Sequence, residues 1–214
     1  IHIQVKREKI SMAVSVAEID AFRPKQARSR ARRAALIEHG VMLLETCELD
    51  EFSVAKITGA LGFSTGSFYA YFPDKEAYFV AIQEWVNETL EGEFASKFNP
   101  DTLAGMTLVQ RFVACVSFAL DYFRRHTGVI RSALRYERRI PQGWAPNRKR
   151  TAQIIAAASA GLKDADRERL ETALQLAFGL MVNALLHDPG PLRLNDRDLQ
   201  QKVLTALAPY LEPH

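Results

Sequence analysis

Two short helical segments separated by a tight turn constrain the fold of this chain more than any other feature. Ser53 can cap the first segment, and Ser64 can cap the second, which runs to about Phe72. Between them, Gly62 stands where the chain must turn sharply, and glycine tolerates such a backbone. Two short helices joined by a three-residue turn with glycine form a helix-turn-helix. The sequence therefore predicts this motif within residues 53–72.

Apolar residues recur at helical spacing along most of the remaining chain. Strand signals, internal repeats and low-complexity tracts are absent from the sequence. The sequence therefore predicts an all-α fold with about nine helices. Besides the two short helices, we expect helices at about residues 27–46, 75–94, 100–125, 127–135, 151–160, 166–186 and 196–211.

Composition argues against a disulfide-rich, zinc-binding or membrane-spanning protein. The chain has 214 residues, of which 48% are hydrophobic and 25% charged, so it can bury a sizeable core. Its two cysteines, Cys47 and Cys115, are too few and too scattered for a disulfide framework or a zinc site. We expect no metal and no cofactor. The apolar stretches are short or interrupted and no signal peptide is evident, so we expect a soluble, cytoplasmic protein.

Charge is concentrated near the start of the chain. Residues 1–22 show no sustained period or helix cap, and we expect them to form a mobile arm. The next residues, RPKQARSRARR at 23–33, hold six basic side chains and no acidic one. This run could be a solvated helix end or a positive lead-in to the first long helix. The net charge of +3 permits a nucleic-acid partner without requiring one.

The start of the second short helix has the residue types that suit the major groove of DNA. Thr65 and Ser67 are small and polar, so they could contact base edges or phosphates. Gly66 lets the backbone come close, and the free amide groups of a first helical turn favour anions. We therefore expect DNA contacts at Thr65, Gly66 and Ser67.

Residues that flank this helix could hold the DNA backbone. Tyr71 and Lys75 carry a hydroxyl and an amine suited to phosphates, and such contacts position a protein without reading sequence. Ser53 and Lys56 could hold the other edge of the groove. Tyr69 is expected to pack mainly with the neighbouring phenylalanines against the first long helix.

The segment from Arg28 to about Ile82 resembles the DNA-binding domain of the TetR family of bacterial transcriptional regulators. The resemblance rests on the first-helix pattern, on Ser53 and Ile57, and on the stretch GFSTGSFYAYFPDKEAYF. That stretch is similar to the family pattern of glycine, an apolar residue, serine, an apolar-tyrosine pair, an aromatic-phenylalanine pair and lysine-glutamate. With the residue chemistry, it indicates DNA contacts at Ser53, Lys56, Thr65, Gly66, Ser67, Tyr69, Tyr71 and Lys75.

Two positions depart from the family pattern. Thr58 stands where the family usually has alanine, and Leu61 stands where a smaller residue is frequent. Both lie in the first of the two short helices, so they bear on how closely that helix can pack.

The resemblance also implies how the chain is divided. It places a DNA-binding domain at residues 23–82 and a domain for ligand binding and dimerisation at residues 83–214. The family acts as homodimers that bind a palindromic DNA operator and release it when a small ligand binds. By the resemblance, the last two long helices, about 166–186 and 196–211, form the dimer. Their wide apolar faces support this role, and ordinary core packing is the alternative.

The ligand pocket is expected among the middle helices. An aromatic and methionine lining would suit a largely apolar ligand, although the same residues would also make an ordinary core. Five basic residues, Arg138, Arg139, Arg148, Lys149 and Arg150, could meet an anionic ligand or form a solvated loop. The candidate ligand-binding residues are Trp85, Cys115, Phe118, Tyr122, Trp144, Phe178, Met181 and Asn183.

Two other classes of protein are alternatives. A helical enzyme would need catalytic residues, but the sequence contains no His-Glu-x-x-His, no Glu-x-x-His pair and no glycine-rich phosphate loop. We therefore expect no catalytic site. A helical protein-interaction module is the second alternative, and it would be favoured if the protein failed to bind DNA but copurified with a partner.

Overall fold

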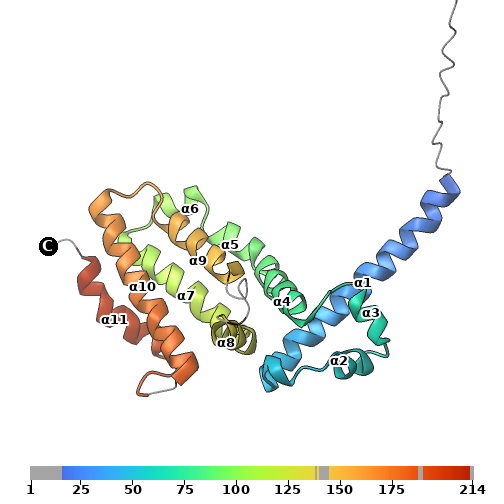
Figure 1. Ribbon diagram of the computed structural model, residues 1–214. Helices are drawn as coiled ribbons and strands as arrows, with labels where there is room; N and C mark the ends of the chain where they lie inside the picture. Colours follow the sequence, from blue (N-terminus) through green and yellow to red (C-terminus); the bar gives the residue numbers. More distant parts are fainter. Residues whose placement is uncertain (1–15, 138, 140–144, 188–189, 213–214) are drawn as a thin grey trace, which may run out of the picture. The chain divides into compact units, whose positions relative to one another are not determined.

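The computed structural model describes residues 16–137, 139, 145–187 and 190–212, and the regular structure in these ranges is entirely helical (Figure 1). The all-α prediction is therefore confirmed. The elements are α1 (Val16–Thr46), η1 (Leu49–Glu51, a 3-10 helix), α2 (Val54–Ala60), α3 (Thr65–Tyr69), α4 (Lys75–Thr89), α5 (Glu91–Lys97), α6 (Pro100–Ala104), α7 (Leu108–Arg125), α8 (Thr127–Tyr136), α9 (Ala145–Ala158), α10 (Asp164–His187) and α11 (Leu199–Leu211).

The chain divides into two compact units, residues 1–35 and residues 36–214. In the first unit, α1 begins at Val16, so residues 16–22 are helical where we expected a mobile arm. Residues 1–15, the rest of that expected arm, lie outside the described residues.

An aromatic core holds the first helices of the second unit together. The rings of Phe68 and Phe72 lie 5.1 Å and 4.9 Å from the ring of Tyr78, and none of the three side chains is more than 2% exposed. The Tyr78 hydroxyl donates a hydrogen bond of 2.6 Å to the carbonyl oxygen of Leu36, and burial raises its pKa. The first turns of α4 are thus part of the same core as the end of α1.

Two helices that we expected to be continuous are broken in the structure. The expected helix at 75–94 ends at Thr89, because the Asn87 carbonyl accepts from the Leu90 N–H, three residues on, and from the Arg150 guanidinium. The expected helix at 100–125 is split into α6 and α7. Thr107 caps α7 in a reciprocal capping box with Gln110, which favours a new helix start.

Two further helix boundaries differ from the prediction. The α9 helix begins at Ala145, six residues before the expected start, so the arginines of that stretch lie on a helix and not in a loop. The last helix begins after Asp198, whose side chain makes no capping hydrogen bond and pairs with Lys202 instead. Local composition therefore located these helices but not their first residues.

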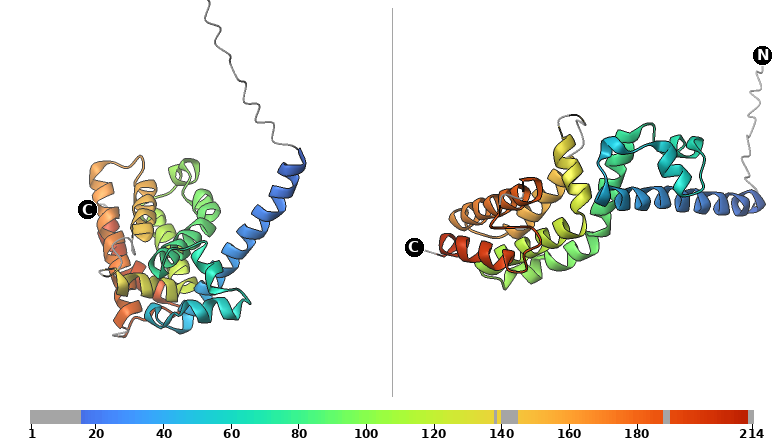
Figure 2. Two further views of the ribbon diagram at one scale, coloured as in Figure 1. Left: turned by 45° about the vertical axis from the view of Figure 1, so that its right-hand side comes forward. Right: turned by 90° about the horizontal axis from the view of Figure 1, so that it is seen from below.

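The remaining helices surround α7. It packs against α8, α9, α10 and α11, and Figures 1 and 2 show α9 and α10 running beside it. Arg111 of α7 is 6% exposed, and its guanidinium donates to the carbonyl oxygens of Leu103, Ala158 and Ala160 at 2.8 Å each. One buried side chain thereby satisfies carbonyls at the ends of α6 and α9.

By length and composition alone, α10 could cross a membrane, and it is the one described helix that passes this test. Core helices of globular proteins pass the same test, and α10 buries Leu170, Leu174 and Met181 against the rest of the fold. We therefore describe α10 as a core helix.

Candidate functional site

The α2–α3 pair has the geometry of a helix-turn-helix. Ser53 caps α2 by accepting from the Lys56 N–H at 3.0 Å, and Ser64 caps α3 by accepting from the Ser67 N–H at 3.2 Å. Gly62 has a φ of +66°, the left-handed conformation that glycine adopts without strain. The predicted caps and turn are all confirmed.

The two departures from the family pattern are accommodated within α2. Thr58 is 2% exposed, and its hydroxyl donates to the Val54 carbonyl oxygen at 2.9 Å, so the extra polar atom is satisfied inside its own helix. Leu61 is half-buried and packs against the hydrophobic core. Close packing of α2 is therefore compatible with both residues.

Four of the eight candidate DNA-contacting residues are exposed, and the other four are half-buried. Lys56, Thr65 and Gly66 are exposed, while Ser67 is half-buried at the start of α3. The half-buried Lys75 donates from its Nζ to the Phe52 carbonyl oxygen at 2.9 Å. We expected Ser53 and Lys56 to hold the opposite edge of the groove from Lys75, but this bond places the Lys75 amine beside the start of α2.

Two tyrosines differ from the prediction. Tyr69 is 53% exposed and meets Phe68 edge to face, so the expectation that it packs mainly in the core is wrong. Successive helical residues point about 100° apart, and Phe68 already occupies the core-facing position. Tyr71, expected to point outward, is half-buried and packs against the core. Their contacts with DNA stay predictions.

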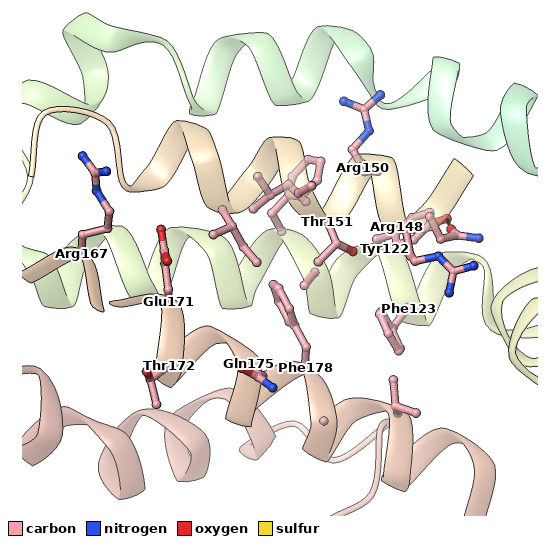
Figure 3. A pocket seen from close by; sticks show the side chains of 18 of the residues that line it. Tyr122, Phe123, Arg148, Arg150, Thr151, Arg167, Glu171, Thr172, Gln175 and Phe178 are labelled. Atoms are coloured by element: carbon pink, nitrogen blue, oxygen red, sulfur yellow. Dashed lines mark hydrogen bonds between the residues drawn. The ribbon is translucent and has the colours of Figure 1, made fainter. Parts of the chain in front are cut away.

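A cavity of about 1080 Å³ lies among α7, α9 and α10 (Figure 3). Three of the candidate ligand-binding residues, Phe118, Tyr122 and Phe178, line it. Figure 3 shows Phe178 pointing from α10 toward Thr151 of α9. Further apolar walls come from Ala119, Phe123, Ile154, Ile155 and Val182.

The two ends of the cavity are polar. In Figure 3, Arg167 and Glu171 lie at one end, and Tyr122 and Arg148 lie at the other. The Arg148 side chain forms an exposed ion pair with Glu137. The cavity therefore has an apolar middle between ends that can hydrogen-bond, which is a common composition for small-molecule sites.

The other candidate ligand-binding residues do not line this cavity. Cys115 and Met181 are fully buried in the core, and burial raises the pKa of the Cys115 thiol to about 12. Trp85 is half-buried on α4 and Asn183 is exposed on α10. Trp144 lies outside the described residues. On α10, only positions on the side of Phe178 and Val182 reach the cavity.

A buried chain of polar side chains connects the cavity to α4, and sequence reasoning missed it. The Tyr122 hydroxyl donates to Asn147 Oδ1 at 2.5 Å, and Asn147 Nδ2 donates to Gln83 Oε1 at 2.5 Å. Gln83 is fully buried and Asn147 is 2% exposed. The sequence did contain one signal for Gln83. It stands four residues after Phe79 and therefore lies on the apolar side of α4, where a polar side chain needs a buried partner.

Arg150 lines the cavity, but the hydrogen bonds of its guanidinium go to other helices and not to a solvated loop. It is 7% exposed, donates to the Asn87 carbonyl oxygen at 3.0 Å and pairs with Glu91 at 2.6 Å. Its guanidinium also lies 5.0 Å from the centroid of the Phe94 ring. In Figure 3 the head of Arg150 points away from Phe178 and toward other helices. It therefore joins α9 to α4 and α5.

A second connection joins α8 to the end of α1 and to η1. The Gly128 N–H donates to Glu45 at 3.1 Å, and a Cβ on Gly128 would lie only 2.0 Å from the Leu44 carbonyl oxygen. Farther along α8, Arg135 pairs with Glu48 at 2.5 Å, and just beyond it Arg139 pairs with Asp50 at 2.7 Å. The hydrogen bond from Arg139 lowers the pKa of the Asp50 carboxyl.

Comparison with known proteins agrees with this geometry. Residues 36–82 match the family model of bacterial regulatory proteins, tetR family. A TetR transcriptional regulator from Rhodococcus sp. RHA1 has a similar fold, with 20% identity and a TM-score of 0.55 over 86% of this chain and 97% of that one. A tetR-family transcriptional regulator from Streptomyces coelicolor gives 20% identity and a TM-score of 0.61 over 85% and 80%. No curated protein sequence matches the chain.

The helix-turn-helix and the matched segment define a DNA-binding transcriptional regulator, a class of protein that acts by binding DNA and not by catalysis. The two solved structures show that the same fold continues through the C-terminal helices. Residues 36–82 thus carry the DNA-binding segment of the TetR family, as the sequence pattern predicted, and the solved structures share the fold of the chain.

Proposed function

We propose that this regulator is a homodimeric repressor that binds a palindromic operator and is released from it by a small, largely apolar ligand. The observation that carries the proposal is the polar chain from Tyr122 through Asn147 to Gln83. It runs from the wall of a ligand-sized cavity to α4, whose first turns belong to the core of the helix-turn-helix. We place the protein in the cytoplasm, where its DNA would be accessible.

The proposed ligand has an apolar body and one polar group. Phe118, Phe178 and the aliphatic walls suit the body, and the Tyr122 hydroxyl with Asn147 suits a hydroxyl or carbonyl oxygen. A ligand oxygen that accepts from Tyr122 would compete with the Tyr122 bond to Asn147, and one that accepts from Asn147 Nδ2 would compete with the bond to Gln83. The position of α4 would then depend on whether the cavity is filled.

Release of DNA requires the ligand to favour one state of the protein. A ligand that binds the DNA-competent and DNA-incompetent states equally shifts nothing, and a shift from 1:99 to 99:1 needs a preference of about 10⁴-fold. We propose that the filled cavity favours a displaced α4, which changes the separation of the two α3 helices in a dimer. DNA affinity would fall as a result.

The test is sequence selection from random duplexes at moderate salt, followed by a screen of apolar compounds that release the selected duplex. We expect an inverted repeat whose half-sites lie roughly 34–36 Å apart, the spacing that a twofold-symmetric dimer reads. Selection of no sequence would contradict the proposal. Copurification of a protein partner in that case would favour an interaction module.

Lys75→Ala is expected to weaken binding to every duplex and to reduce its salt dependence, because a phosphate contact carries no sequence information. Thr65→Ala and Ser67→Ala are expected to change which half-site is preferred. Fluorescence anisotropy over a range of KCl concentrations measures both effects. Lys163→Ala, an exposed lysine in the turn between α9 and α10, serves as the control and should bind as the unaltered protein does. Identical effects from all three DNA-domain variants would contradict these roles.

The proposed dimer forms through α10 and α11. Leu176 of α10 is 55% exposed and Tyr210 of α11 is 42% exposed, while only 33% of the apolar window of α10 is buried within one chain. Exposed apolar surface of this extent on a helix pair favours a partner surface, and a second copy supplies one by twofold symmetry.

Leu176→Glu is expected to weaken self-association, because it places a charge in the proposed apolar interface. Sedimentation equilibrium at micromolar concentration should show a larger monomer fraction than in the unaltered protein. Met42→Glu makes the same change at another exposed apolar residue, on α1, and should leave self-association unchanged. Equal monomer fractions in the two variants would count against this interface.

A further inference from the structure

We propose that a groove between α4 and α9 binds a small zwitterion, such as a free amino acid with an aliphatic side chain. The groove has a volume of about 450 Å³, which lies within the usual range for small-molecule sites. Val80 of α4 and Pro146 of α9 give it apolar contact surface. The site would be a second one, besides the cavity among α7, α9 and α10.

The groove and the cavity lie on different sides of α9. Lys149 and Gln153 line the groove, whereas Thr151 and Ile155 line the cavity. The two pairs are offset by two residues along α9, which is about 200° around the helix axis. Arg150 lines both spaces, and in Figure 3 its head points away from α10. A ligand in the groove would therefore contact α4 without entering the cavity.

The two walls of the groove carry opposite charges. The α4 wall holds Glu84 and Glu88, which are exposed and stand four residues apart, so their carboxylates repel each other. The α9 wall holds Lys149 and Arg150. Ala145, the first residue of α9, lies in the same wall, and the positive end of a helix dipole favours an anion there.

Two buried residues of the groove have polar atoms with no hydrogen-bond partner among the described residues. Asn87 is 8% exposed, and its Nδ2 donates to the Gln83 carbonyl oxygen at 3.0 Å, which leaves Oδ1 without a donor. Arg150 is 7% exposed, and its Nη2 donates to the Asn87 carbonyl oxygen and to Glu91, which leaves Nε and Nη1 without an acceptor. Because Arg150 binds the backbone of Asn87 itself, the unused donors and the unused acceptor belong to one small region.

A zwitterion matches this arrangement better than a ligand of one charge. Its ammonium group can donate to Asn87 Oδ1 and to the carboxylates of Glu84 and Glu88, and its carboxylate can accept from Arg150 and Lys149. An anion alone would be repelled by the α4 wall, and a cation alone would be repelled by the α9 wall. An unpartnered buried polar atom destabilises a fold, so a ligand that satisfies both kinds of atom is favoured.

A ligand held by both walls would join α4 to α9. The hydrogen bond from Arg150 to the Asn87 carbonyl already makes this connection beside the groove. Under the proposed function, DNA is released when α4 is displaced, so a groove ligand should favour the undisplaced state and tighten DNA binding. This effect rests on the proposed function, whereas the binding site itself does not.

The test is isothermal titration calorimetry of the full chain with three compounds that share one side chain. Leucine carries both charges, N-acetyl-leucine carries only the negative one and leucine amide carries only the positive one. We expect leucine to bind, and each derivative to bind at least about tenfold more weakly, because it lacks one set of charge-assisted hydrogen bonds. Absence of leucine binding at millimolar concentration, or equal affinity for leucine and either derivative, would overturn the proposal.

Variants of the two walls locate the site. Glu84→Gln/Glu88→Gln should weaken leucine binding at least about tenfold and should not weaken N-acetyl-leucine binding. Lys149→Gln should weaken leucine and N-acetyl-leucine alike, by up to roughly fivefold, and leave leucine amide unchanged. Asp101→Asn/Asp121→Asn makes the same change in charge as the first variant at exposed residues outside the groove, and it should bind leucine as the unaltered protein does. Equal losses in the two double variants would contradict the site.

Anisotropy with the selected inverted repeat, with and without saturating leucine, tests the connection to α4. We expect leucine to tighten DNA binding by roughly fivefold or more, the usual lower end of coupling between two sites. Unchanged DNA affinity in a protein that binds leucine would overturn the coupling to α4 and leave the site in place. A protein that binds leucine but no duplex would overturn the proposed function and leave the site in place.

Discussion

Phe68→Ala is expected to abolish binding to every DNA duplex while leaving the C-terminal helices folded. The α3 helix has only five residues, and a helix this short has no stability of its own. Phe68 is fully buried, with its ring 5.4 Å from Phe72 and 5.1 Å from Tyr78, so it anchors α3 to α4. Truncation of a buried phenylalanine costs about 3–5 kcal/mol of unfolding free energy.

The adjacent aromatic residue supplies the control for this prediction. Tyr69→Ala removes a ring of similar size that is 53% exposed, so it should lower the unfolding free energy by less than about 1 kcal/mol. Hydrogen exchange of the α2 and α3 amides in both variants measures the local stability directly. Equal protection of these amides in the two variants would show that the Phe68 ring does not hold α3 in place.

Gly128→Ala is expected to destabilise the contact between α8 and α1 by about 3 kcal/mol, the upper end of the usual cost of overpacking. The added Cβ would lie 2.0 Å from the Leu44 carbonyl oxygen and 2.6 Å from the Glu45 nitrogen. Both atoms are backbone, so no side chain can move aside, and α8 must shift away from α1. Urea unfolding measures the loss of stability.

The same substitution should also change DNA affinity, because the Leu36 carbonyl of α1 accepts from Tyr78 of α4, and α8 packs on α7, which lines the cavity. Gly92→Ala is the matched control. Gly92 lies in α5 with open space around its missing side chain, so alanine there should be neutral or stabilise the helix by up to about 1 kcal/mol. A Gly128→Ala protein that unfolds at the same urea concentration as the unaltered chain would contradict the close contact.

Local signals were sufficient to predict the helix-turn-helix. Ser53, Ser64 and Asp74 each precede a helix, and each side chain accepts from the N–H three residues on. Each of these hydrogen bonds joins residues only three positions apart, so it can be predicted from the local sequence without knowledge of the fold. The turn at Gly62 is equally local. The family match covers this same part of the chain.

Long-range contacts explain what the sequence did not predict. The end of α4 depends on Arg150, which lies 63 residues after the Asn87 carbonyl that it binds. The buried chain through Asn147 joins three helices, and no single helix pattern contains it. For the cavity, periodicity identified Phe118, Tyr122 and Phe178, but it could not separate them from Cys115 or Met181, because core and cavity residues share the apolar faces of α7 and α10.

The position of α4 also limits how chimeric regulators can be made from the DNA-binding helices of one protein and the C-terminal helices of another. A boundary after residue 82 falls inside this continuous 15-residue helix. Tyr78 and Ile82 belong to the core beside α1, while Gln83 accepts from Asn147 on α9 one residue later. A chimera that joins the DNA-binding helices of one regulator to the C-terminal helices of another must therefore keep α4 compatible with both. We expect such grafts to succeed when α4 and its two sets of partners are transferred together.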